Sequence, residues 1–77
     1  MPEPALTYRF FTVEDFAPDL YTIVTRRDRA IIGRIEWYAR WKEWVLVPDE
    51  GTVWSAGCLD DVADFIREHA RKGGKDA

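Results

Sequence analysis

The sequence predicts an α+β fold in which a small antiparallel β-meander of three to four strands packs against one C-terminal α-helix. Two observations support this prediction. Runs of β-branched and aromatic residues, separated by turn residues, are followed by an amphipathic helical pattern. The chain has 77 residues, so we expect a single domain over residues 1–77 with one core and loose ends at 1–7 and 73–77.

The composition suits a small domain that has to build its core from few residues. Hydrophobic residues make up 47% and aromatic residues 14% of the chain, and large rings supply much buried area. The net charge of −3 argues against bulk electrostatic binding to DNA or to a membrane. One cysteine excludes an intrachain disulfide, and neither a signal-peptide pattern nor a membrane-span pattern is present. We therefore expect a cytoplasmic protein without membrane contact.

The first half of the chain contains strand-like segments. Residues Tyr8 to Val13 have strand-like content, although two adjacent phenylalanines break the alternation. Pro18 and the aspartate after it predict a turn. The segment 20–27 is rich in β-branched and aromatic residues and predicts a strand, and the polar segment 27–29 predicts a short reversal.

The segment from Ala30 to Tyr38 predicts the next strand. Its alternation places one set of residues on one face (Ile31, Gly33, Ile35 and Trp37) and a second set on the other (Ile32, Arg34, Glu36 and Tyr38). The mixed second face predicts one buried side and one solvent side. A glycine inside a strand, here Gly33, indicates a bulge or a close backbone approach.

The segment from Tyr38 to Pro48 supports two interpretations. Trp37, Trp41 and Trp44 have the i, i+4, i+7 spacing of a helix, whereas the β-preferring run 45–47 is typical of a buried strand. We favour a strand that ends at position 37 or 38, an irregular corner and a strand that begins near Trp44. Trp37 is then expected in the core, and Trp44 could lie on either face. Trp41 lies at the corner, where its exposure would indicate a function.

A turn and a helix complete the predicted fold. Residues 48–51 predict a turn, and residues 52–55 a short returning strand. From Leu59 onward, apolar residues recur on one helical face, which the sequence assigns to Leu59, Val62, Ala63 and Ile66, with Phe65 and Ala70 at its margins. Asp60, Asp61 and Asp64 are expected in the early turns and Arg67, His69, Arg71 and Lys72 in the late turns, an order that complements the helix dipole. Gly73 and Gly74 are expected to end the helix.

The second half of the chain resembles a pattern found in small, uncharacterised proteins of phages, prophages and plasmids. The matching residues are Ile32, Gly33, Ile35, Trp37, Trp41, Lys42, Trp44, Val45, Pro48, Thr52, Val53, Trp54, Cys58, Leu59, Asp61, Val62, Ala63, Asp64, Phe65 and Ile66. Leu46 departs from the pattern, which has an aromatic residue there, and the first thirty residues are unmatched. The resemblance implies a phage or mobile-element origin and no particular activity.

Aromatic and basic residues alternate around the predicted corner and form the main candidate binding site. We assign partner binding to Trp41, Arg40, Lys42, Tyr38 and Arg34, because Trp, Tyr and Arg are enriched at protein interaction hot spots. The competing interpretation is that the rings fill the core while the charges lie on the solvent face. The acidic net charge favours a protein partner over nucleic acid.

The nucleic-acid alternative uses the basic turn formed by Arg26, Arg27 and Arg29. Arginine contacts phosphate, and the aromatic rings could stack on bases. Three strands followed by a helix is also similar to the plan of the arm-type DNA-binding domains of phage integrases, a likeness of topology only. A third hypothesis is a homodimer formed through an open sheet edge.

No residue pattern supports catalysis, a metal site or a cofactor. Cys58 lies at the start of the predicted helix and His69 about three turns further on, so the two cannot contact each other directly. We expect Cys58 to be a small buried residue under the sheet. One cysteine and one histidine cannot form a structural zinc site, and the helix aspartates lack a purpose-built loop. The sequence therefore predicts a non-enzymatic accessory protein that acts by binding another protein.

Overall fold

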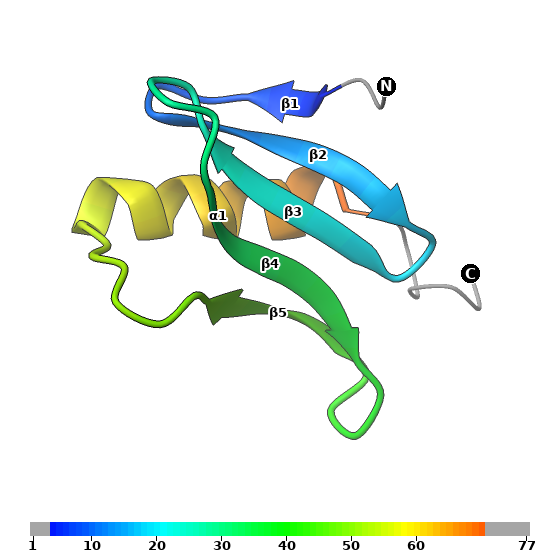
Figure 1. Cartoon of the computed structure of the whole chain (residues 1–77). Helices are drawn as coiled ribbons and strands as arrows, with labels where there is room; N and C mark the ends of the chain where they lie inside the picture. The colour runs from blue at the N-terminus through cyan, green and yellow to red at the C-terminus, as the bar shows by residue number, and fades with distance from the viewer. Residues whose placement is uncertain (1–3, 71–77) are drawn as a thin grey trace.

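A five-stranded antiparallel sheet is covered on one face by a single helix (Figure 1). The computed structural model describes residues 4–70. The strands lie side by side in chain order as β1 (Pro4–Thr7), β2 (Phe11–Ala17), β3 (Leu20–Thr25), β4 (Ile31–Tyr38) and β5 (Glu43–Pro48), and α1 (Ala56–Glu68) follows. The predicted α+β meander with a C-terminal helix is confirmed, but the sheet has five strands rather than three to four.

The additional strand comes from the N-terminus. Residues 4–7, expected to be part of a loose end, form β1 and pair with β2. β1 has only four residues and begins with a proline, a combination that is tolerated at a sheet edge but gives a weak sequence signal. The two adjacent phenylalanines have different roles, because Phe10 lies in the turn before β2 and is exposed, whereas Phe11 begins β2 and is buried.

A bulge at the start of β4 explains the glycine in this strand. Val24 pairs with Ile31 while Ile23 pairs with Gly33, so β4 has one extra residue, Ile32, that has no partner in β3. An ideal Cβ on Gly33 would lie 3.1 Å from Cζ2 of Trp54 and 3.2 Å from the carbonyl oxygen of Val47. Of the two alternatives predicted for this glycine, the close approach is found at Gly33 itself, and the bulge lies next to it, at Ile32. Ile31 is not buried with the rest of its predicted face, because it precedes the bulge.

The irregular corner predicted between two strands is confirmed. β4 ends at Tyr38 and β5 begins at Glu43, and the turn between them includes Lys42 with a φ of 55°. The Trp41 N–H donates to the Tyr38 carbonyl oxygen at 3.1 Å. Trp37 and Trp44 face each other across β4 and β5, so the helical spacing of the tryptophans does not form a helix.

Two predictions for the segment before and within the helix are wrong. Residues 52–55, predicted as a returning strand, form a loop that ends at Ser55, the N-cap of α1, whose side chain accepts the Cys58 N–H. The helix begins at Ala56, three residues before the predicted start, so its first turn holds no acidic residue. Arg71 to Gly74, predicted in the last turn and at the end of the helix, lie outside the described residues.

The buried face of the helix overlaps the predicted one but is rotated toward Phe65 and away from Leu59. Val62 and Phe65 are buried, whereas Leu59 is 47% exposed. Phe65 lies edge-on against Tyr21 of β3, with ring centroids 4.8 Å apart. Fully burying one such side chain contributes about 1.5–3 kcal/mol. The core contains Phe11, Val13, Tyr21, Ile23, Ile35, Trp44, Val62 and Phe65, with Cys58 and Trp37 packed against it while partly buried.

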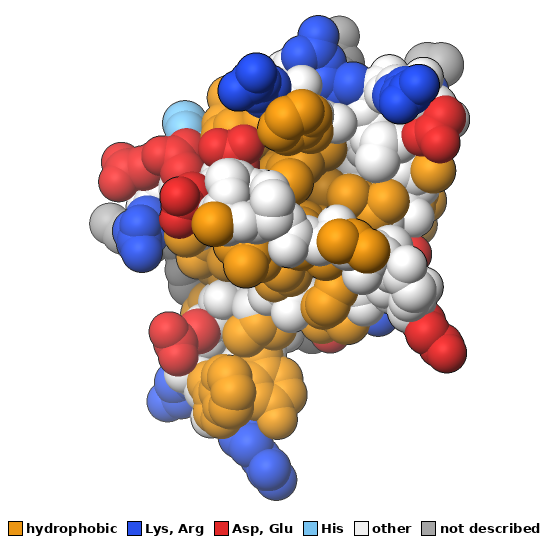
Figure 2. Space-filling view, turned by 90° about the vertical axis from the view of Figure 1, so that its left-hand side faces the viewer, with side chains coloured by type: hydrophobic (Ala, Val, Ile, Leu, Met, Phe, Trp, Pro, Cys, Tyr) orange, Lys and Arg blue, Asp and Glu red, His pale blue; other side chains and the backbone are white. Residues whose placement is uncertain are grey.

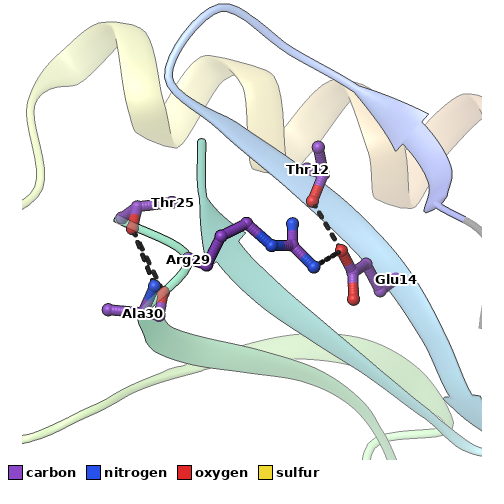
Figure 3. A network of polar contacts seen from close by, with 5 residues as sticks. All are labelled: Thr12, Glu14, Thr25, Arg29 and Ala30. Atoms are coloured by element: carbon purple, nitrogen blue, oxygen red, sulfur yellow. Dashed lines mark hydrogen bonds and ion pairs between the residues drawn. The ribbon is translucent and has the colours of Figure 1, made fainter. Parts of the chain in front are cut away.

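The other face of the sheet carries a polar cluster over β2. Arg29, in the β3–β4 turn, places its guanidinium 2.8 Å from Glu14, and the Thr12 hydroxyl donates to the same carboxylate oxygen at 3.0 Å (Figure 3). Glu14 and Thr12 are both buried. Since a buried carboxylate requires charged or hydrogen-bonded partners, this arrangement satisfies it. The Arg29 side chain therefore covers the β2 side of this face.

Candidate functional site at the end of the β4–β5 hairpin

Two aromatic side chains meet at the end of the β4–β5 hairpin, on the sheet face that α1 does not cover. The rings of Tyr38 and Trp41 are edge-on, with centroids 4.9 Å apart and planes at 88°. Trp41 is 62% exposed. An edge-to-face pair of this kind adds about 0.5–1.5 kcal/mol and orients both rings. The contact therefore holds a large exposed ring in one position.

A hollow of about 310 Å³ lies beside this pair. Its lining consists of Glu36, Tyr38, Trp41, Val45, Leu46 and Val47. Pairing in register explains how the lining forms, since Glu36 lies opposite Val45 and Tyr38 lies opposite Glu43. Facing residues of an antiparallel pair project to the same side. Alternate residues of both strands therefore contribute to one partly apolar surface, which Leu46, between the two valines, also borders.

Basic residues neighbour the lining residues along the hairpin. Arg40 and Lys42 are exposed in the turn on either side of Trp41. Arg34 lies on β4 and its Nε is 3.6 Å from Oε2 of Glu36, one of the lining residues. Hydrophobic side chains lie next to Lys and Arg side chains at the lower end of the molecule, where the hairpin ends (Figure 2). The structure thus places all five residues assigned to partner binding on one hairpin.

The basic turn assigned to nucleic-acid binding is largely occupied by contacts within the chain. Arg26 donates to the carbonyl oxygens of Tyr8 and Arg9, at 3.2 Å each. Arg29 forms the ion pair with Glu14 described above. Arg27 is exposed in the same turn. Two of the three arginines therefore have structural contacts that a phosphate would have to replace.

The remaining candidate residues occupy separate places. Cys58 is partly buried in the first turn of α1 and packs against the core. Asp64 accepts a hydrogen bond of 2.7 Å from the Tyr8 hydroxyl and lies 3.8 Å from Nε2 of His69. Within residues 4–70 no three His, Cys, Asp or Glu side chains are grouped closely enough to hold a metal ion. Over the same residues no helix is both long and apolar enough to cross a membrane.

Four residues of the hollow are not among those assigned to binding from the sequence. The sequence places Glu36 on a mixed strand face and Val45, Leu46 and Val47 in a buried strand, whereas the structure places all four in the lining of the hollow with Trp41. The alternation of β4 did give the correct face for Glu36. Only the register between β4 and β5 identifies which residues of β5 join it.

Comparison with protein-family models, with curated proteins and with solved structures gave no match.

Proposed function

We propose that this chain is a non-enzymatic accessory protein of the phage or mobile-element type that acts by binding another protein through the end of the β4–β5 hairpin. One observation carries the proposal. Trp41 is 62% exposed, yet it is fixed by an edge-to-face contact with Tyr38 beside a partly apolar hollow. An exposed tryptophan contributes little to a core and much to an interface, where Trp, Tyr and Arg dominate the binding energy.

The surroundings of the hollow indicate the chemistry of the partner. The valines of β5 and the two rings favour an apolar or aromatic side chain in the hollow. Arg40 and Lys42 are exposed on either side of Trp41 in the turn, on a chain whose net charge is −3, so the turn is locally more basic than the protein as a whole. We infer a partner that presents an apolar side chain next to carboxylates, because complementary charge steers association and orients the complex.

Affinity capture from a host lysate tests the proposal, with the wild-type chain, Trp41→Ala and Phe16→Ala as baits. Phe16 is a suitable control because it is also an exposed aromatic residue, 68% exposed, and lies on β2 rather than beside the hollow. We expect a protein that wild type and Phe16→Ala retain and that Trp41→Ala loses, both with and without nuclease.

Two outcomes would count against the proposal. Equal capture by all three baits would remove Trp41 from the interface. A signal that disappears on nuclease treatment and weakens steeply with salt would favour nucleic-acid binding instead.

A further inference from the structure

The strand β5 is an outer strand of the sheet and pairs on one side only, with β4. Figure 1 shows no other described element alongside its outer side. Four of its six residues are Trp44, Val45, Leu46 and Val47, and Glu43 is its only charged residue. Edge strands that do not pair with another chain are usually short, charged or interrupted by a proline or a bulge. The opposite outer strand, β1, follows that rule with four residues and an initial proline, whereas β5 does not.

The hydrogen bonds to β4 determine which backbone groups of β5 point outward. The Asp49 N–H donates to the Ile32 carbonyl oxygen at 2.9 Å, so these two residues form a hydrogen-bonded pair. In an antiparallel ladder such pairs alternate, and Arg34–Val47 and Glu36–Val45 are therefore also hydrogen-bonded. The N–H and carbonyl groups of Leu46 consequently point away from β4.

Pro48 fits the same geometry. It occupies an outward-pointing position, where the N–H that proline lacks is not needed by β4. Proline is confined to such positions in sheets. Opposite an antiparallel copy, each Pro48 would lie across from Trp44 of the other copy, so one ladder hydrogen bond is lost at each end of the pairing. The outward amide of Leu46 lies in the middle of the strand and is unaffected.

The charges around β5 are opposite at its two ends. Arg40 and Lys42 precede the strand, with Glu43 beginning it, and Asp49 and Glu50 follow it. Antiparallel pairing with an identical strand about Leu46 would place Lys42 opposite Glu50 of the second copy and Glu43 opposite its Asp49. The two ends remain complementary in net charge, because the basic end carries two positive charges and one negative charge, whereas the acidic end carries two negative charges. It would also align Val45 and Val47 with the valines of the second copy, because alternate residues share a face.

We propose that β5 pairs antiparallel with β5 of a second copy, near Leu46, and continues the sheet across a two-fold axis. The inference does not depend on the partner proposed for the hairpin end. An isologous contact of this kind is self-complementary by symmetry. Complementary end charges distinguish the second copy from an unrelated peptide, which would have no reason to match both ends of the strand.

Analytical ultracentrifugation of the full chain, from about 1 μM to about 1 mM, tests the proposal, since an interface of modest size has a dissociation constant in this range. We expect the mass to rise toward that of a dimer. Lys42→Glu and Glu50→Lys should each raise the dissociation constant about tenfold, since each places like charges together twice. The double variant Lys42→Glu/Glu50→Lys should restore the dissociation constant to within about threefold of the wild-type value.

Amide exchange of the wild-type chain provides a measurement that needs no variant. The Leu46 N–H should exchange more slowly at high than at low concentration, whereas the Val45 N–H, bonded to β4, should be protected at both. A monomer throughout the series would overturn the proposal. A dimer whose dissociation constant is unchanged in both charge-reversal variants would also overturn it. So would a Leu46 amide whose exchange rate does not change with concentration.

Discussion

The Tyr8 hydroxyl donates a 2.7 Å hydrogen bond to Asp64, joining the β1–β2 turn to the helix across 56 positions of the chain. The Tyr8 ring also packs against the ring of Phe11, the first residue of β2, with the two ring centroids 5.5 Å apart. The contact links the outer part of the sheet to α1, which supplies the second layer of the core.

Replacing Tyr8 with phenylalanine keeps the ring and removes the donor. We expect Tyr8→Phe to lower the free energy of unfolding by about 1 kcal/mol at neutral pH, because the Asp64 carboxylate is exposed enough to be rehydrated. Urea denaturation measures the difference. An unchanged midpoint would show that the hydrogen bond contributes nothing to stability.

The same pair predicts a dependence on alkaline pH. Partial burial, the hydrogen bond to Asp64 and the negative charges of Asp64 and Asp61 all raise the pKa of Tyr8 above its ordinary value. A raised folded-state pKa means that the contribution to stability is complete below about pH 10, the ordinary pKa of tyrosine, and is lost as the pH rises above it. Wild type should therefore lose stability more steeply than Tyr8→Phe above about pH 10. Parallel pH profiles of the two proteins would contradict this assignment.

The close approach at Gly33 predicts that alanine at this position destabilises the fold, the opposite of its usual effect in a strand. Alanine in place of a strand glycine ordinarily stabilises, but here the added Cβ would lie 3.1 Å from the Trp54 ring and 3.2 Å from a backbone oxygen. The ring is itself held by a 2.9 Å hydrogen bond from its Nε1 to the Thr52 hydroxyl. We expect Gly33→Ala to destabilise the fold by about 1–3 kcal/mol, as overpacking does.

Gly57 is the matched control for this substitution. It lies in the first turn of α1, where an added Cβ would meet only the Ser55 hydroxyl oxygen, at 3.8 Å. Gly57→Ala should therefore stabilise by about 0.5–1 kcal/mol. If both variants shifted the urea midpoint in the same direction, the close packing of Trp54 on Gly33 would be wrong.

The orientation of α1 can be tested with two substitutions six positions apart. Phe65 is fully buried against Tyr21, whereas Leu59 is 47% exposed. We expect Phe65→Ala to cost about 3–5 kcal/mol, enough to unfold much of a small domain, and Leu59→Ala to cost about 0.5 kcal/mol or less. Thermal unfolding followed by circular dichroism distinguishes the two, and equal effects would support the helix face predicted from the sequence instead.

The sequence was sufficient for the class of fold because its signals are local. Alternation in β4, the turn residues 48–51 and the helical pattern after them predict a meander followed by a helix. β1 was missed because a four-residue outer strand with a proline gains its stability from pairing with β2 rather than from its own residues. The face of α1 was predicted correctly at Val62 and Ile66 but centred too close to Leu59, because Leu59 and Phe65 are equally apolar and only the position of the sheet decides between them.

The candidate site was predicted in part for the same reason. The corner at Trp41 follows from strand signals on both sides, and its five assigned residues do lie on one hairpin. The hollow beside it depends on the register of β4 against β5, which places Val45 opposite Glu36. Likewise, nothing local in the sequence indicates that Arg29 reaches across the sheet to Glu14.

The central claim is that Trp41 serves binding and not folding. The measurement that tests it most directly is the dissociation constant of the captured partner for wild type and for Trp41→Ala, with urea denaturation of both proteins alongside. We predict that the variant binds about 30-fold more weakly, as loss of about 2 kcal/mol at a hot spot requires, while its unfolding free energy changes by less than about 1 kcal/mol. Equal dissociation constants, or a variant destabilised as strongly as Phe65→Ala, would contradict the account.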